Sequence, residues 1–361
     1  MLTSRIQGIS LTGLCMAVPS NRLTTEMLYE KFGHDIVDKT VKMVGVKEAH
    51  HSVKEQVASD LALVAARKLL LEKKVDLSSI GALVYVTQTP DYRVPATAVI
   101  LQHRLGLSKN CAAFDVNLGC SGFVFGLHTV ASLLSTINCQ RALLLFGDTS
   151  SKLADPESRA STILFGDASG ALILEKDDHA VPLRFALKTD GSRYPAIIVP
   201  GGAFRSRCYS EEELQMRNRS CDFPLMNGTD VFNFSIHDVP ELIKAFWAEE
   251  NETAADYDCV ALHQANLFIM KQIARKIGVK GDKLLVCIDR YGNTSSASIP
   301  LSLADRYGTA RDGDIRALIS GFGVGLSWGV ADIRMRSTDI FPILYSDEFF
   351  PPVEFDEYTY E

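Results

Sequence analysis

The chain has 361 residues, of which 47% are hydrophobic and 22% are charged, and its formal net charge is −7. These values are ordinary for a globular enzyme, and the length allows two domains or one duplicated unit. The negative charge argues against a general nucleic-acid binder, which needs many cationic contacts to phosphate, so no nucleic-acid partner is expected.

The hydrophobic pattern predicts strands that alternate with helices along the first 175 residues. Strands are expected at 9–18, 80–87, 112–116, 141–147 and 170–175, and helices at 25–31, 59–73, 96–105 and from 120 onward. Residues 181–227, with paired glycines and the charged stretch 205–219, indicate an insertion over the surface. A helix at 238–249 then precedes strands at 258–262, 284–288, 315–320 and 329–335. Such alternation is typical of layered α/β proteins with buried sheets.

The second half of the chain repeats the order of the first. The matching segments are 84–87 with 260–263, 115–120 with 289–293, and 141–143 with 316–318. Thr87 precedes Cys120 by 33 residues and His263 precedes Asn293 by 30, which indicates a duplicated unit. Packed back to back, two copies would bring Cys120 and Asn293 together from equivalent turns, with His263 at a neighbouring strand end. Ligands of α/β sheets bind at such carboxyl ends.

Cys120 lies where an apolar strand passes into an apolar helix, between Gly119 and Gly122. The glycines permit a sharp turn and the close approach of a bound group. At a helix N-terminus a thiol is expected to ionise more easily than a free one, which would make Cys120 a nucleophile. The alternative is a small buried apolar cysteine, and this stretch alone does not separate the two.

His263 and Asn293 have structural alternatives as well: a core histidine with satisfied hydrogen bonds, and a turn or helix-capping residue. Their occurrence in turns equivalent to that of Cys120 favours a shared site. The glycine-rich segment 321–325 lacks the G-x-G-x-x-G spacing and the acidic residue of a dinucleotide loop.

The eight cysteines include no CxxC pair, so neither a metal site nor a disulfide framework is predicted. No apolar run approaches the length of a membrane span, and the short patch at 9–18 is interpreted as a strand rather than a signal peptide. A cytoplasmic protein without a membrane partner is therefore expected.

Five ordered motifs give a specific resemblance. They are DVNLGCSGF around Cys120, FGDASGA at 165–171, ALHQANL around His263, RYGNTSSASIP around Asn293 and GFGVGLSWG at 321–329. Over about residues 6–336 the chain resembles 3-oxoacyl-[acyl-carrier-protein] synthase III, a family of thiolase-fold condensing enzymes. The resemblance implies an α/β, thiolase-like fold in which two duplicated βαβαβαββ halves form five αβαβα layers. The corresponding parts are a first half at 1–180, a connecting insertion at 181–230, a second half at 231–336 and an acidic, aromatic tail at 337–361.

The resemblance also implies roles for the three residues. Cys120 would carry an acyl primer as a thioester. His263 and Asn293 would donate hydrogen bonds to the carbonyl oxygen of a malonyl thioester as carbon dioxide leaves. The backbone N–H groups of Cys120 and Val324 would form a second oxyanion hole. Acyl-CoA and malonyl-acyl carrier protein would be the substrates of a homodimer that needs no further cofactor.

Substrate contacts are implied at Arg159, Val94, Phe322, Asn266 and Phe268. Val94 aligns with a bulky residue that closes the primer pocket across the dimer, so room for a primer longer than acetyl is expected. Phe268 replaces a docking arginine of the family.

Two further positions depart from the family, since Lys39 and Met43 stand where other members carry the tryptophan and the arginine, respectively, that grip CoA. The basic residues Lys271, Arg275 and Lys276 would dock an acidic carrier protein, although a solvated basic face is the alternative.

The sequence thus predicts an acyltransferase that performs a decarboxylative Claisen condensation, in fatty-acid initiation or a related specialised pathway. The alternative on the same scaffold is transfer of the acyl group from Cys120 to a hydroxyl, an amine or a 3-oxoacyl acceptor. A non-catalytic partner subunit is a third hypothesis, against which the intact set of Cys120, His263 and Asn293 argues.

Overall fold

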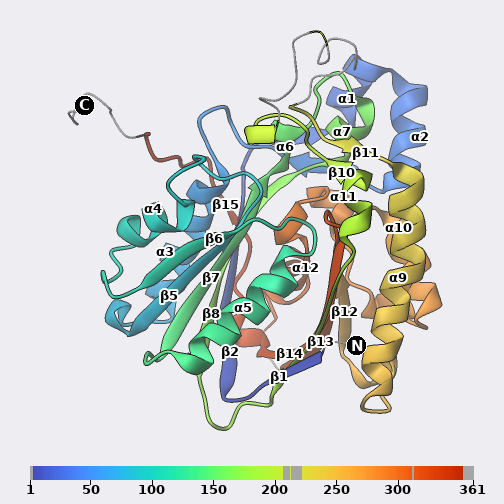
Figure 1. Ribbon diagram of the computed structural model, residues 1–361. Coiled ribbons are helices and arrows are strands. Elements are labelled where there is room, and N and C mark those ends of the chain that lie inside the picture. The colour runs from blue at the N-terminus through green and yellow to red at the C-terminus, as the bar shows by residue number, and fades with distance from the viewer. Residues whose placement is uncertain (1–2, 206–211, 213–221, 311–312, 353–361) are drawn as a thin grey trace.

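The computed structural model describes residues 3–205, 212, 222–310 and 313–352, and two β-sheets organise it (Figure 1). The six-stranded sheet has the order β15 (Leu344–Tyr345), β2 (Ile9–Val18), β8 (Asp167–Lys176), β7 (Arg141–Thr149), β5 (Ile80–Val86), β6 (Ala112–Val116). The five-stranded sheet has the order β1 (Thr3–Ile6), β9 (Leu183–Thr189), β14 (Ser327–Arg336), β13 (Asp314–Gly323), β12 (Cys259–Leu262).

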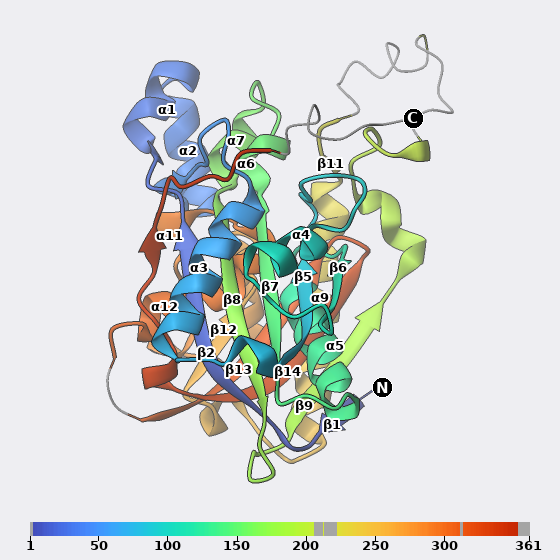
Figure 2. The same cartoon turned by 90° about the vertical axis from the view of Figure 1, so that its left-hand side faces the viewer.

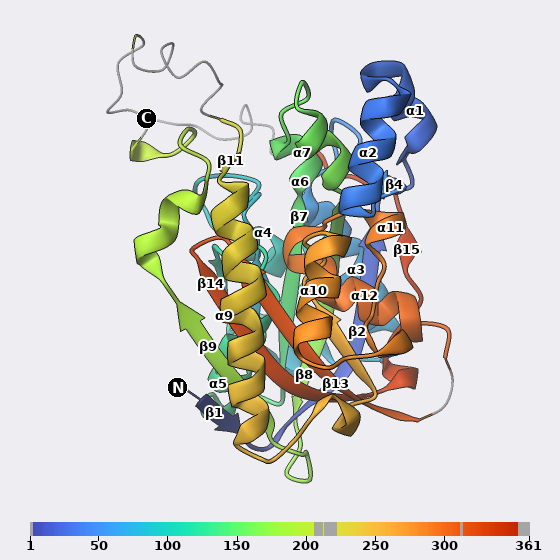
Figure 3. The same cartoon turned by 90° about the vertical axis from the view of Figure 1, so that its right-hand side faces the viewer.

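Helices fill three layers around these two sheets. Helices α5 (Gly122–Thr136) and α12 (Ser298–Tyr307) lie between the sheets and contact both. Helices α3 (Ala58–Glu72) and α4 (Thr97–Arg104) cover the outer face of the six-stranded sheet (Figure 2), and α9 (Gly228–Ala248) and α10 (Leu267–Lys276) cover that of the five-stranded sheet (Figure 3). The expected five-layered, thiolase-like α/β arrangement is confirmed.

The strand order confirms the duplication. Strands β2, β8, β7 and β5 of one sheet correspond to β9, β14, β13 and β12 of the other, both in their order along the chain and in their position in the sheet. The turn that carries Cys120 precedes α5, and the turn that carries Asn293 leads to α12. The two central helices therefore occupy equivalent places, and their N-terminal ends approach the same end of the molecule (Figure 1).

Strand β9 corrects the sequence interpretation, which assigned residues 181–227 to a surface insertion. Leu183–Thr189 is an internal strand that pairs with β1 and β14. Its pattern was hidden by Arg184, a buried cation that forms ion pairs with Glu252 at 2.8 Å and Asp332 at 3.5 Å. A paired charge can occupy a buried strand, which hydrophobic periodicity alone does not reveal.

Two other expected strands differ from the structure. Residues 284–288 form only an isolated bridge between Leu284 and Val260 before the chain enters α11 (Ile288–Tyr291). Strand β6, expected to be buried, lies at a sheet edge with its residues partly or fully exposed. The outermost segment of the duplicated unit is thus an exposed edge strand in the first half and forms no regular strand in the second.

Smaller elements cover the end of the molecule near Cys120 and Asn293. They are β3 (Arg22–Thr24), α1 (Thr25–Phe32), α2 (His34–Val44), β4 (Glu48–His50), α6 (Ser150–Leu153), α7 (Arg159–Leu164), β10 (Ile197–Ile198) and β11 (Leu225–Met226). Most of the charged stretch 205–219 lies outside the described residues. Within the described ranges no helix combines the length and apolar character needed to cross a membrane.

The tail packs on the body of its own chain as far as it is described. Strand β15 pairs with β2, and the Phe350 ring lies against the guanidinium groups of Arg67 and Arg104, at 5.0 and 5.1 Å. The Phe350 N–H donates to the buried carboxylate of Asp60 at 3.1 Å. The tail beyond Pro352 lies outside the described residues.

Candidate active site

The turn between β6 and α5 presents Cys120, and the two glycines beside it lie close to side chains of the neighbouring strand and loop. A Cβ on Gly119 would lie 2.1 Å from the Gln88 Oε1, and one on Gly122 would lie 2.5 Å from the Val86 Cγ1. A side chain at Gly119 would displace the flexible end of Gln88, whereas one at Gly122 would push the turn away from Val86 of β5. Gly122 therefore lets the nucleophile turn lie against the sheet, with Cys120 itself only half-buried.

His263 follows β12 and is 1% exposed. Its Nδ1 and the Ser298 Oγ, at the start of α12, are hydrogen-bonded at 2.7 Å, and its ring meets Phe322 edge-on at 5.5 Å. Burial lowers the pKa of His263 from 6.5 to about 3, and a hydrogen bond with the backbone of Ser295 offsets this only partly. The imidazole is therefore neutral at pH 7 and carries one N–H.

Asn293 is 6% exposed and lies between α11 and the 3-10 helix η6 (Ser295–Ala297). Its Oδ1 accepts a hydrogen bond from the Ser295 N–H at 3.0 Å, and its Nδ2 donates to the Ala265 carbonyl at 3.4 Å. These contacts fix the orientation of the amide. The Nδ2 carries a second hydrogen that a ligand could accept.

The three expected catalytic residues share neighbours. The Ser295 backbone contacts both His263 and Asn293, and the Ser295 Oγ lies 3.0 Å from the place of a Cβ on Gly119, the residue before Cys120. On the other side, a Cβ on Gly323 would lie 2.6 Å from the Cys120 Cβ and 2.8 Å from its sulfur. Because Phe322 also packs on His263, the end of β13 contacts both residues.

The expected oxyanion donors surround the sulfur, but the expected pKa of the thiol is wrong. Hydrogen bonds from the backbone of Val324 and of Cys120 itself lower the pKa. Burial and, to a smaller extent, the buried Asp148 carboxylate outweigh them, so the pKa of Cys120 is raised to about 11. Position at a helix N-terminus predicted the sign of one contribution, whereas the desolvation of the thiolate depends on the packed environment.

Asp148 is a buried residue of this region that the sequence reasoning missed. It follows the apolar part of β7, and its carboxylate accepts hydrogen bonds from the Gln88 N–H at 2.7 Å and the Thr87 Oγ1 at 3.2 Å. It also accepts from the Ser296 Oγ at 2.7 Å. The carboxylate thereby ties the two halves together beneath the site. An acidic residue directly after a fully apolar strand was the available signal.

The expected substrate residues are dispersed. Phe322 is buried beside His263, whereas Val94 is 82% exposed on the loop before α4, and Arg159 is exposed at the start of α7. The Asn266 side chain caps α10 by accepting the Ile269 N–H at 2.8 Å.

Phe268 is 49% exposed and stacks on Phe232, with ring centroids 5.8 Å apart. Its side chain places an exposed apolar group on the surface of α10.

The three basic residues expected to dock a carrier do not form one face. Lys271 and Arg275 are exposed on α10 and line a cavity of about 370 Å³ together with Lys280. Lys276 instead donates from its Nζ to the Ile236 carbonyl of α9 at 2.7 Å. Its ammonium joins two helices, so the expected docking role of Lys276 is corrected to a packing role.

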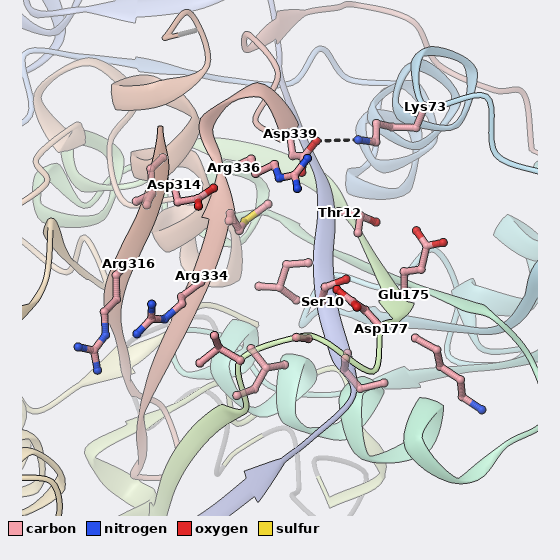
Figure 4. Close-up of a pocket in the computed structure, with 18 of the residues that line it drawn as sticks. Ser10, Thr12, Lys73, Glu175, Asp177, Asp314, Arg316, Arg334, Arg336 and Asp339 are labelled. Carbon is pink, nitrogen blue, oxygen red and sulfur yellow. Dashed lines mark hydrogen bonds and ion pairs between the residues drawn. The ribbon is translucent and has the colours of Figure 1, made fainter. Parts of the chain in front are cut away.

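The cavity of about 650 Å³ shown in Figure 4 lies elsewhere. It is lined at the start of β2 and β13 and at the end of β14, whereas His263 and Phe322 lie at the opposite strand ends. Some of the charged side chains that line this cavity form ion pairs with one another, such as Lys73 with Asp339 at 2.7 Å.

Comparison with known proteins agrees with this arrangement. The family model for 3-oxoacyl-[acyl-carrier-protein (ACP)] synthase III matches residues 114–191. The separate model for the C-terminal part of that family matches residues 247–335. A 3-oxoacyl-(acyl-carrier protein) synthase from Burkholderia xenovorans is 35% identical over 96% of this chain and 99% of its own, with a TM-score of 0.90. The chain belongs to the 3-oxoacyl-[acyl-carrier-protein] synthase III family.

Two further structures extend the comparison. The synthase III from Pseudomonas aeruginosa is 30% identical over 94% of this chain and all of its own, with a TM-score of 0.79. A priming β-ketosynthase from a polyketide biosynthetic pathway shares the fold at 21% identity, covering 95% and 98% of the two chains with a TM-score of 0.79. This synthase III family member is therefore an acyl-transferring condensing enzyme.

Proposed function

We propose that the protein joins an acyl primer, carried on Cys120, to malonyl-acyl carrier protein with loss of carbon dioxide, giving a 3-oxoacyl thioester. One observation carries the proposal. The Cys120 sulfur has two backbone N–H donors around it. Residues that contact the Cys120 turn also contact the neutral His263 and the oriented amide of Asn293. A thiol with separate sets of donors suits a reaction with two different oxyanions.

In the first step the Cys120 sulfur attacks the carbonyl carbon of an acyl thioester. The bond from that carbon to the donor sulfur breaks, and the departing thiolate takes up the proton that Cys120 lost. One thioester replaces another, so the step is nearly balanced in energy and requires thiolate rather than a strong base. The N–H groups of Cys120 and Val324 stabilise the tetrahedral oxyanion, each contributing about 3 to 4 kcal/mol in a dry site.

In the second step the malonyl thioester loses carbon dioxide, and the electron pair of the broken carbon–carbon bond forms an enolate. In this proposal the Ser298 hydroxyl donates to Nδ1 of His263, so the single N–H of the neutral imidazole lies on Nε2. The enolate oxygen then replaces the Ser295 backbone as the acceptor of that N–H. The second hydrogen of the Asn293 amide is the other donor. The enolate carbon then attacks the acyl carbon on Cys120, and the Cys120 thiolate leaves.

The partners of this reaction follow from the family and from the exposed groups. We propose acyl-CoA as primer donor and a homodimer in which Val94, exposed in the isolated chain, borders the primer pocket of the partner. A primer longer than acetyl is expected there. Lys271 and Arg275 supply an exposed cationic surface for the acidic carrier, and the reaction needs no further cofactor.

A second candidate reaction is acyl transfer from Cys120 to a hydroxyl, an amine or a 3-oxoacyl acceptor without decarboxylation. It is favoured by two exposed apolar side chains that replace residues of the family. Met43 is 62% exposed and Phe268 is 49% exposed, at positions where the family carries CoA-gripping and docking residues. Apolar side chains at these two positions suit a carrier or acceptor other than the usual pair.

Release of labelled carbon dioxide from carboxyl-labelled malonyl-acyl carrier protein, with and without acyl-CoA, tests the proposal. We expect release that depends on the primer and equals the 3-oxoacyl product formed. His263→Ala and Asn293→Ala should each reduce release by about 100-fold while Cys120 still acylates. Acylated protein that releases no carbon dioxide with any primer would contradict the proposal and favour the second candidate.

A further inference from the structure

Two buried serines connect the nucleophile turn to the loop that bears Val324. Ser121 follows Cys120 and is 1% exposed, and Ser327 begins β14 and is 2% exposed. Their hydroxyl oxygens are 2.7 Å apart, and the Ser327 Oγ donates to the Val324 carbonyl at 2.7 Å. Sequence reasoning assigned neither residue a role.

The direction of this hydrogen-bond chain follows from counting protons. A serine hydroxyl has one proton, and Ser327 donates its proton to the Val324 carbonyl, which can only accept. Ser121 must therefore donate to the Ser327 oxygen. The chain runs from the Cys120 turn, through Ser327, to the carbonyl of Val324, and the N–H of that same residue bonds to the Cys120 sulfur.

The loop needs such a support because of its composition. Val324 lies between Gly323 and Gly325, and glycines allow the backbone many conformations. Gly323 cannot be replaced by a larger residue, since a Cβ there would lie 2.6 Å from the Cβ of Cys120. The loop cannot be stiffened by larger residues without displacing the nucleophile. A hydrogen bond from outside the loop can fix Val324 without occupying the site.

We propose that Ser121 and Ser327 are positioning residues that aim the Val324 N–H at the Cys120 sulfur and at the oxyanion that forms beside it. The contribution to the oxyanion rests on the proposed function, whereas the contribution to the thiolate does not. Misplacing one donor by about 1 Å can slow a reaction by up to about 100-fold. The Ser327 hydroxyl matters more than that of Ser121 because it contacts the loop directly.

The test compares Ser327→Ala, Ser327→Thr and Ser121→Ala with Ser302→Ala. The control loses an equally buried hydroxyl that donates at 2.7 Å to the Ile299 carbonyl in α12. Two rates are measured on each folded protein: acylation of Cys120 by an acyl-CoA, and alkylation of Cys120 by iodoacetamide between pH 7 and pH 10. Alkylation requires the thiolate but no oxyanion hole.

Ser327→Ala should acylate at least about tenfold more slowly than wild type, with Ser121→Ala intermediate and Ser327→Thr restored. Alkylation by Ser327→Ala should also be slower at each pH, because its thiolate loses a donor. Rates like those of Ser302→Ala in both assays would overturn the proposal. If Ser327→Ala does not fold, the same comparison is made with Ser121→Ala. If no donor acylates the wild type, the proposed function fails while the alkylation series still tests the positioning role.

Discussion

Replacing His263 by asparagine should flatten the pH dependence of stability between pH 7 and pH 5. The pKa of this histidine is lowered by burial from 6.5 to about 3 in the folded protein. Between these two values the unfolded chain binds the proton and the folded chain does not. Stability therefore falls as the pH decreases from 6.5 toward 3. At pH 5, about 1.5 units below the unfolded pKa, the loss is about 2 kcal/mol.

Urea unfolding followed by tryptophan fluorescence measures this difference at pH 7 and pH 5, at one protein concentration. Wild type should lose about 2 kcal/mol more on acidification than His263→Asn does. Because each variant is compared with itself at the two pH values, the stability that the substitution loses at both pH values, by breaking the contact with Ser298, cancels. His237→Asn, an exposed histidine of α9, is the control and should follow wild type. If His263→Asn lost as much stability between pH 7 and pH 5 as wild type does, the imidazole would not be held neutral by burial.

Two further substitutions have matched controls in the chain. Phe350→Ala should lower the free energy of unfolding by about 2 kcal/mol in denaturant titrations, since its partly buried ring packs against two guanidinium groups. Phe349 is 49% exposed, so Phe349→Ala should change that free energy by less than about 0.5 kcal/mol. Gly323→Ala should slow acylation of Cys120 by at least about 100-fold, because the added Cβ would lie 2.8 Å from the sulfur. The control Gly191→Ala has open space around the added Cβ and should be acylated at the wild-type rate. Equal effects within either pair, measured by unfolding or by intact mass, would count against the packing described.

Much of this fold was predictable because its signals are local and repeated. Apolar runs such as those of β5 and β7 predict buried strands by composition alone, and the matching order of the two halves predicts a duplicated unit. Strand β9 was missed because Arg184 interrupts its pattern and is neutralised by Glu252 and Asp332, which lie far away in the sequence. Ion pairing of this kind depends on tertiary packing, and periodicity does not report it.

The candidate site was predictable in its composition but not in its electrostatics. The duplication related the turns of Cys120 and Asn293, and the structure gives them neighbours in common. The pKa of the thiol was predicted with the wrong sign, because burial depends on packing by both halves. Lys276 had the charge of a docking residue next to Lys271 and Arg275, and only the structure shows its ammonium bonded to the Ile236 carbonyl. Side chains that serve packing and side chains that serve binding can have the same sequence pattern.

The central claim is that the Cys120 sulfur carries the acyl group through the reaction. Intact-mass spectrometry after incubation with a series of acyl-CoA and acyl-carrier donors tests it directly, with Cys120→Ala and Cys111→Ala compared under the same conditions. The account predicts one acyl group per chain in wild type and Cys111→Ala, none in Cys120→Ala, and loss of the adduct when malonyl-acyl carrier protein is added. Acylation that persists in Cys120→Ala, or an adduct that malonyl-acyl carrier protein never discharges, would contradict it.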